Sequence, residues 1–185
     1  MPSQPIDPLV PCTGSFRDVS LEFVPDGPPL SNGERSDLFP NYPTELAFLH
    51  VFLDGKNVTG SVPSAYMLLL LDHLLSSLGD LVQGNPAVAM WFADPWQFDL
   101  VGDPAQDRVI VTLHVPGRWE AMKDVLVPLS RFGRSVIRVA DGWREYLIKN
   151  YPVEISDHTK DAQYKRFTEH LTRARQILLE YEAQL

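Results

Sequence analysis

The sequence predicts an α+β fold, in which an antiparallel sheet is packed by helices. Between residues 87 and 127, short segments of alternating apolar and polar residues are separated by turn residues, which indicates a meander. The gaps between them are shorter than the dozen or more residues that a parallel crossover needs. Three other segments carry apolar residues at helical spacing, at about 63–82, 130–149 and 159–184. We therefore expect one α+β domain over residues 1–185.

The N-terminal part of the chain is the least regular. Nine of the sixteen prolines precede residue 45, so we expect an irregular arm over residues 1–16 and a long loop over 25–45. Alternation predicts a strand near 17–24. The nearly continuous apolar run at 46–53 predicts a strand that is buried on both faces and ends at Asp54-Gly55. We expect both strands to join the sheet of the meander.

The clearest β signal is a hairpin over residues 96–115. The sequence Gly-Asp-Pro-Ala-Gln-Asp at 102–107 predicts its turn. Apolar residues alternate with other residues on both sides of this turn, which predicts two antiparallel strands. These alternating residues are Trp96, Phe98 and Leu100, then Val109, Val111, Leu113 and Val115.

Each predicted helix has an apolar stripe and a candidate N-terminal signal. Ser61 or Ser64 is placed to cap the first helix, and Ser130 the second. The apolar stripes predict a set of buried residues, because side chains three and four positions apart share a helix face. Phe98 of the hairpin is added to this set. The predicted core therefore contains Leu71, Leu75, Phe98, Val136 and Trp143.

The last predicted helix has apolar residues at alternating spacings of three and four, as in a heptad pattern. This pattern favours packing on the protein's own domain, because Tyr, Phe and Ala are untypical of a strong leucine-zipper dimer. We therefore favour a monomer, with a dimer through the C-terminal helix as the alternative. The stripe contains Tyr164, Phe167, Leu171, Ala174, Leu178, Tyr181 and Leu185.

Charge is divided unevenly along the chain. Residues 1–107 hold fourteen carboxylates and three basic residues, whereas residues 108–185 hold ten carboxylates and thirteen basic residues. The net charge of −8 argues against nucleic-acid binding, which needs an excess of Lys and Arg. No apolar run reaches the roughly 18–20 residues of a membrane span. The single Cys12 and the absence of a signal-peptide pattern indicate a cytoplasmic protein.

The usual chemical signatures are absent from the sequence. It contains no glycine-rich phosphate loop, no His-Glu-x-x-His and no Cys-x-x-Cys pair, so we predict no catalytic residue, metal ligand or cofactor. An acid–base site would require His50, His73 or His114 to converge with a carboxylate such as Asp72 or Asp99. Three arginines of the second helix, Arg131, Arg134 and Arg138, lie on one side of it. They suit an anion site, a solvated face or ion pairs with the acidic part.

Carboxylates and a tryptophan cluster around the predicted hairpin. One interpretation is a docking patch for a basic protein, since acidic residues steer association and Trp provides an interface anchor. A second is a site for a hard metal cation. A third is that the carboxylates form turns and the tryptophan lies in the core. The residues of this predicted patch are Asp94, Trp96, Asp99, Asp103 and Asp107.

The order of elements resembles that of small cytoplasmic bacterial α+β families that include polymorphic-toxin immunity proteins. The resemblance lies in Leu46–Gly55, the Leu-rich helix 64–82, the hairpin strands, and Val127-Pro128-Leu129 leading into helix 130–149. It implies a non-enzymatic, acidic protein that acts by binding a basic partner. The alternative hypothesis is a small enzyme or ligand-binding domain with a pocket between the sheet and helix 64–82. A structural dimer module is a third.

Overall fold

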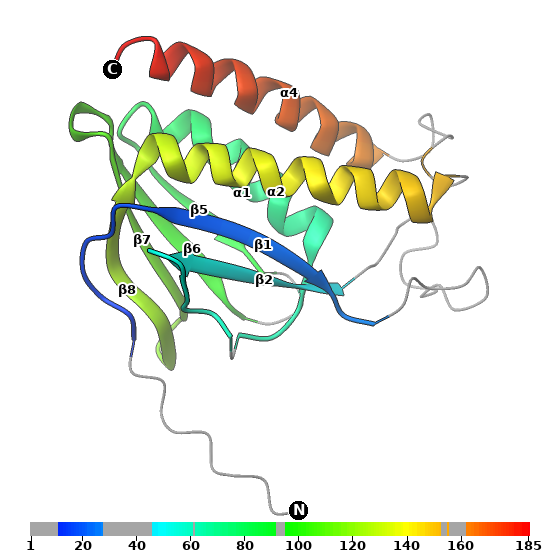
Figure 1. The fold of residues 1–185 in the computed structure, drawn as a ribbon, viewed down its shortest axis with the longest axis horizontal. Coiled ribbons are helices and arrows are strands. Elements are labelled where there is room, and N and C mark those ends of the chain that lie inside the picture. Colours follow the sequence, from blue (N-terminus) through cyan, green and yellow to red (C-terminus); the bar gives the residue numbers. More distant parts are fainter. Residues whose placement is uncertain (1–10, 28–45, 61, 92–94, 153–154, 156–161) are drawn as a thin grey trace, which may run out of the picture.

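The fold contains two antiparallel sheets and three helices in the described part of the chain, which confirms the predicted α+β class (Figure 1). The computed structural model describes residues 11–27, 46–60, 62–91, 95–152, 155 and 162–185. The helices are α1 (Met67–Leu81), α2 (Leu129–Asn150) and α4 (Ala162–Glu182). The strands are β1 (Val19–Pro25), β2 (Leu46–Leu53), β3 (Lys56–Asn57), β4 (Ala65–Tyr66), β5 (Pro86–Met90), β6 (Gln97–Asp103), β7 (Arg108–Val115) and β8 (Trp119–Pro128).

The main sheet is the predicted meander, with the strand order β5-β6-β7-β8. Strands β6 and β7 form the predicted hairpin, and a short 3₁₀ turn at Pro104–Gln106 joins them. Asp107 closes this turn with φ 46°, in the left-handed region that Asp tolerates better than most residues. The predicted alternation is confirmed, because Phe98 and Leu113 on the inner face are buried while their neighbours along each strand are not.

The predicted single sheet is wrong in one respect: β1 and β2 form a separate small sheet with β3 and β4. The edge of β1 that would meet another strand faces α2 instead, and the Leu21 N–H donates to Ser135 Oγ over 2.6 Å. The outer edge of β8 carries isolated bridges to Cys12 and Ser15. The two edges therefore have other partners, and the strands cannot join the main sheet there.

The composition of β2 predicts burial on both faces, but the structure buries only one of them. Its residues alternate between buried and half-buried along the strand. Leu49 and Val51 face the core, whereas Phe48, His50 and Phe52 lie on the outer face of the small sheet. The apolar run of β2 therefore corresponds to burial of one face only. Aromatic side chains cover part of its other face.

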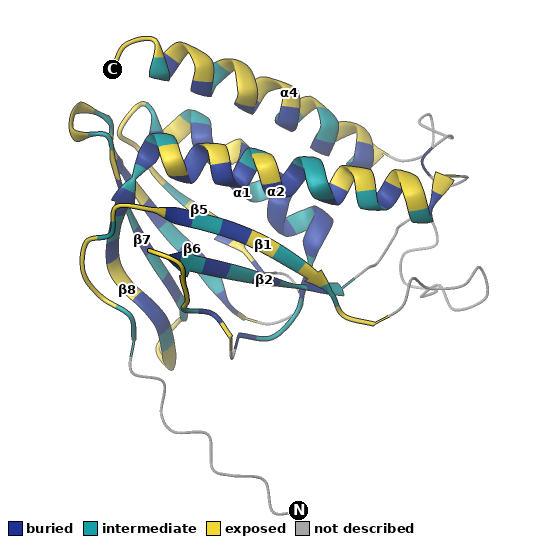
Figure 2. Cartoon of the chain, viewed as in Figure 1, coloured by how far each residue is buried: buried dark blue, intermediate teal, exposed yellow. Residues whose placement is uncertain are grey.

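The helices lie together on one side of the main sheet (Figure 1). Helices α1 and α2 contact the strands, and α4 packs on these two helices. Figure 2 shows the buried sides of the helices turned toward the interior of the molecule. The predicted core is confirmed, since each of its members is at most 2% exposed: Leu71, Leu75, Phe98, Val136 and Trp143.

The C-terminal stripe packs inside the molecule. Its first six residues are buried against α1 and α2, whereas Leu185 is 65% exposed. This agrees with the prediction that the stripe packs on its own domain, and the contact is to helices rather than to a sheet. The six buried residues are Tyr164, Phe167, Leu171, Ala174, Leu178 and Tyr181.

The predicted starts of two helices need correction. Helix α1 begins at Met67 rather than near residue 63, because Ala65 and Tyr66 pair with β2, and its N-cap Tyr66 makes no side-chain capping bond. Ser130 does not cap α2 but lies in its first turn. The capping carboxylate comes from Asp107 on the hairpin, which accepts bonds from Ser130 N over 2.8 Å and Ser130 Oγ over 2.7 Å.

Candidate functional site

The predicted acidic patch is divided by the structure into residues with different surroundings. Asp94 lies outside the described residues. Trp96 is 4% exposed and belongs to the core, so it presents no anchor at the surface. Asp107 joins the hairpin to α2 and α4, because it also accepts a bond from the Tyr181 hydroxyl over 3.1 Å. Burial and the Asp107 carboxylate together raise the pKa of Tyr181.

Asp99 and Asp103 are the two patch residues that face solvent on the main sheet. Asp103 is exposed at the end of β6. Asp99 is half-buried and contacts His114, with 2.7 Å between Asp99 Oδ2 and His114 Nε2. Gln97 donates to Asp99 Oδ1 over 2.7 Å. One predicted histidine–carboxylate pair therefore forms, between neighbouring strands.

This pair belongs to the outer face of the main sheet, defined here as the side of β5–β8 that faces away from the helices. Across the four strands, Pro86, Val101, Ile110 and Leu126 are in register and form an apolar row. Val101 is 42% exposed, and on β5 Val88 is 50% exposed. The outer face thus presents apolar side chains to solvent beside the two carboxylates.

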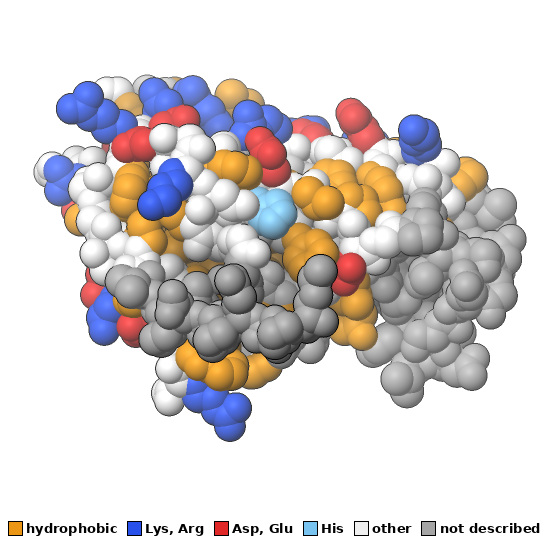
Figure 3. Space-filling model, turned by 60° about the horizontal axis from the view of Figure 1, so that its bottom comes forward, with side chains coloured by type: hydrophobic (Ala, Val, Ile, Leu, Met, Phe, Trp, Pro, Cys, Tyr) orange, Lys and Arg blue, Asp and Glu red, His pale blue; other side chains and the backbone are white. Residues whose placement is uncertain are grey.

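The outer face of the small sheet has a different composition. Phe48, His50 and Phe52 follow one another on it, and the rings of Phe48 and His50 stack with centroids 6.3 Å apart. Val24 beside them is 48% exposed. On the face of the molecule drawn in Figure 3, a histidine lies beside apolar side chains. His50 Nδ1 is buried and has no hydrogen-bond partner among the described residues.

A second histidine–carboxylate cluster lies between α1 and α4. The Asp72 side chain is 3% exposed and accepts bonds from Arg166 Nε over 2.8 Å and His170 Nδ1 over 2.7 Å. Both partners come from one face of α4, where they are four residues apart. Asp72 lies on α1 among leucines, so the three side chains clamp the two helices together. The sequence does not predict this cluster, although a lone carboxylate among the leucines of that helix is a signal for a buried partner.

The hollow beside this clamp is a polar cavity of about 230 Å³ between α1 and α4. His170 lines it with Ser76 and Arg173. Nearby, burial lowers the pKa of His73, with the charge of Asp72 acting in the opposite direction.

Burial also raises the pKa of the Cys12 thiol, which disfavours the reactive thiolate.

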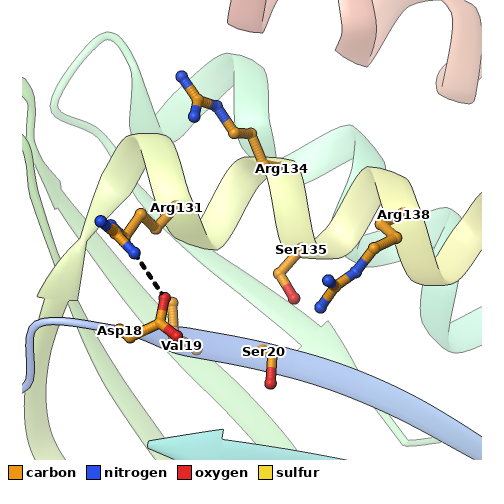
Figure 4. A pocket seen from close by; sticks show the side chains of 7 residues that line it. All are labelled: Asp18, Val19, Ser20, Arg131, Arg134, Ser135 and Arg138. Atoms are coloured by element: carbon orange, nitrogen blue, oxygen red, sulfur yellow. Dashed lines mark hydrogen bonds and ion pairs between the residues drawn. The ribbon is translucent and has the colours of Figure 1, made fainter. Parts of the chain in front are cut away.

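The three arginines predicted to share one side of α2 line a cavity of about 270 Å³ against β1 (Figure 4). Arg131 pairs with Asp18 over 2.8 Å, and Arg134 pairs with Glu182 on α4 over 2.5 Å. The expected ion pairs with the acidic part of the chain are therefore formed by Arg131. A larger apolar groove of about 450 Å³ runs between α2 and α4 and shares Arg134 and Arg138 with this cavity.

No protein-family model, curated protein or solved structure matches the chain. Within the described residues, no helix is both long enough and apolar enough to cross a membrane. In the same part of the chain, no group of three or more His, Cys, Asp or Glu residues is placed to hold a metal ion.

Proposed function

We propose that this protein is a non-enzymatic, cytoplasmic binding protein of the immunity type, and that it docks a basic protein partner on the outer face of its main sheet. The observation that carries this proposal is the group of exposed apolar side chains on that face, Val88, Met90 and Val101, beside Asp99 and Asp103. Large exposed apolar patches with polar borders are typical of protein interfaces. Carboxylates at the border favour a partner with basic residues there.

The proposed contact set differs from the patch predicted from the sequence. Trp96 is buried and Asp107 is occupied by α2 and α4, so neither side chain is free to meet a partner. In the proposed contact set, exposed apolar residues of the main sheet replace these two residues. The revised set is Val88, Met90, Asp99, Val101 and Asp103.

The alternative, a small enzyme or ligand-binding domain, is favoured by one observation. Asp72 holds His170 through Nδ1, the arrangement by which a carboxylate orients a general-base histidine, and His170 lines the cavity between α1 and α4. This cavity lies on the side of α1 toward α4. The sequence predicts the pocket on the other side of α1, toward the sheet. Leu70, Leu71 and Leu74 of this helix are fully buried in the core.

The docking proposal is tested by site-specific crosslinking followed by kinetics. A photo-reactive residue is placed at Val101, and at exposed Gln176 on α4 as the matched control, in cells that produce the protein. We expect a crosslinked partner from position 101 only. With that partner purified, its association rate should fall as salt rises, because screening weakens steering by charge.

Reversing Asp99 and Asp103 to Lys together should lower the association rate of the purified partner at least several-fold at low salt. The immunity interpretation adds that the partner is toxic to cells and that co-expression of this protein restores growth. Crosslinks from position 176 alone, or an association rate that ignores both salt and charge reversal, would refute docking on the outer face. Turnover of a small substrate that is lost in His170→Gln would establish the alternative.

A further inference from the structure

The cavity between β1 and α2 plays no part in the proposed docking function. It measures about 270 Å³, and seven residues line it. From α2 come three arginines and a serine, and from β1 comes a short stretch of strand (Figure 4). In a protein of net charge −8, this is a recess whose lining holds three guanidinium groups and one carboxylate.

The helical repeat explains why these side chains meet. Positions 131, 134, 135 and 138 are related by steps of three and four residues, so they lie on one face of α2. Arg131 and Arg138 are about 10 Å apart along the helix axis at a rise of about 1.5 Å per residue. Ser135 lies between them and is buried, with its Oγ accepting from Leu21 N over 2.6 Å.

Strand β1 contributes backbone donors to the same recess. Alternate residues of an antiparallel strand direct their N–H groups to the same edge. Because the Leu21 N–H points to α2, the N–H of Val19, two residues earlier, lies on that edge as well. Ser20 lines the cavity too, but Figure 4 shows its side chain directed away from α2.

The three arginines are not equally engaged. Arg134 points away from β1 in Figure 4 and pairs with Glu182. Arg131 pairs with Asp18, and both side chains are 56% exposed. Surface ion pairs of this kind contribute little to the stability of the fold. Arg138 points toward the recess beside Ser135 and has no ion-pair partner among the described residues.

We propose that this recess binds a dianionic phosphate group, either free or as a monoester. The donors around it are the planar guanidinium of Arg138, the hydroxyl of Ser135, the Val19 N–H and, opposite them, Arg131. A dianionic phosphoryl group offers several acceptor oxygens to such a set, and guanidinium groups match its geometry with paired hydrogen bonds. Asp18 pairs with Arg131 and therefore competes with the ligand.

The test is a titration of the whole protein with inorganic phosphate and with phenyl phosphate at constant ionic strength, followed by amide chemical shifts. Saturable shifts are expected at Val19, Ser20 and Leu21. Tighter binding of phenyl phosphate identifies an esterified ligand, and equal binding identifies free phosphate. Acetate, with a single charge and two oxygens, should bind at least several-fold more weakly. Shifts spread evenly over the surface, or confined to another site, would overturn the proposal.

Two variants of opposite expected effect separate this site from general attraction of anions. Arg138→Ala should weaken phosphate binding about tenfold, the loss of one charge-assisted hydrogen bond. Asp18→Asn should tighten it roughly threefold, because it releases Arg131 from an exposed ion pair. Arg144→Ala, an exposed arginine of the same helix outside the recess, is the matched control and should change nothing.

Two results for phosphate binding by these variants would contradict the proposal. Equal binding by the Arg138→Ala and Arg144→Ala proteins would overturn it, provided both keep the wild-type pattern of amide shifts elsewhere. An Asp18→Asn protein that binds more weakly than the wild type would overturn it too. Arg138→Lys keeps the charge but not the planar fork, and intermediate binding by this variant is expected.

Discussion

Similar residues have different uses on the outer face of the main sheet and in the helix layer formed by α1, α2 and α4. In the helix layer, Asp72 is buried and bound to two side chains of α4. On the outer face, Asp99 is 41% exposed at its side chain and Asp103 is exposed. Val101 on that face is 42% exposed, whereas Leu71 in the helix layer is fully buried.

This comparison shows that burial, rather than residue type or clustering in the sequence, separates structural groups from groups that are available to a partner. A buried carboxylate without partners would destabilise the fold strongly, so its partners are part of the structure. An exposed one contributes little to stability and remains free for recognition. Paired substitutions, one in each region, test this difference directly.

The largest expected difference is between two apolar truncations. Leu71→Ala removes buried methyl groups and leaves a cavity, so it should lower the free energy of unfolding by about 2–5 kcal/mol. Val101→Ala, on the exposed row, should change it by less than about 0.5 kcal/mol. Urea unfolding followed by circular dichroism measures both. A loss under about 1 kcal/mol for Leu71→Ala would show that α1 is packed differently from the structure.

The next pair compares two carboxylates that each contact a histidine. Asp72→Asn should cost about 1–3 kcal/mol, because Arg166 and His170 lose a buried, charged acceptor but are themselves partly exposed. Asp99→Asn should cost less than about 0.5 kcal/mol. Chemical unfolding near neutral pH gives both values. Equal losses in the two variants would contradict the distinction between clamp and surface pair.

The hairpin itself contains a third pair, Asp107 and Asp103. Asp107→Ala removes the bonds to Ser130 and Tyr181 and should cost about 1–2 kcal/mol, as the loss of a helix cap does. Asp103→Ala should have little effect, since the residue is exposed. Asp107→Gly separates the lost bonds from backbone strain, because glycine accepts the positive φ at this position. If Asp107→Gly is clearly more stable than Asp107→Ala, part of the loss in the alanine variant comes from backbone strain rather than from the lost capping bonds.

The sequence predicts the elements of this fold better than the relations between them. Period-two alternation around 102–107 and the apolar stripes of Leu71 and Leu171 specify hairpin and helices through local spacing. In the structure, the edge of β1 outside the small sheet is bonded to α2 through Leu21 and Ser135, which are 114 positions apart. No local pattern contains that information.

The same limit applies to the candidate sites. Asp107 looks like a turn residue and also caps a helix, because Ser130 is 23 positions away and Tyr181 is 74. The alignment of Val101 with Ile110 follows from the hairpin, but its extension to Pro86 and Leu126 requires the register of β5 and β8. The arginine spacing on α2 was visible in the sequence, whereas the facing edge of β1 was not.

The smallest expected effect concerns His73, on the helix layer beside the Asp72 clamp. Burial lowers the pKa of this histidine in the folded state, and the nearby charges of Arg166 and His170 act in the same direction. The unfolded chain therefore binds a proton more readily than the folded one as the pH falls below about 6.5. Stability that is fully present above that pH should decrease as acid protonates the unfolded state first.

The expected loss of stability between pH 7 and pH 5 is small, because the side chain is only partly buried and Asp72 opposes the shift. His73→Gln removes the titrating group and keeps a polar side chain of similar size. The difference in unfolding free energy between wild type and variant should become smaller, or change sign, as the pH falls, since only the wild type loses stability through this group. A difference that grows in favour of the wild type at pH 5 would mean that Asp72 outweighs burial and raises the pKa instead.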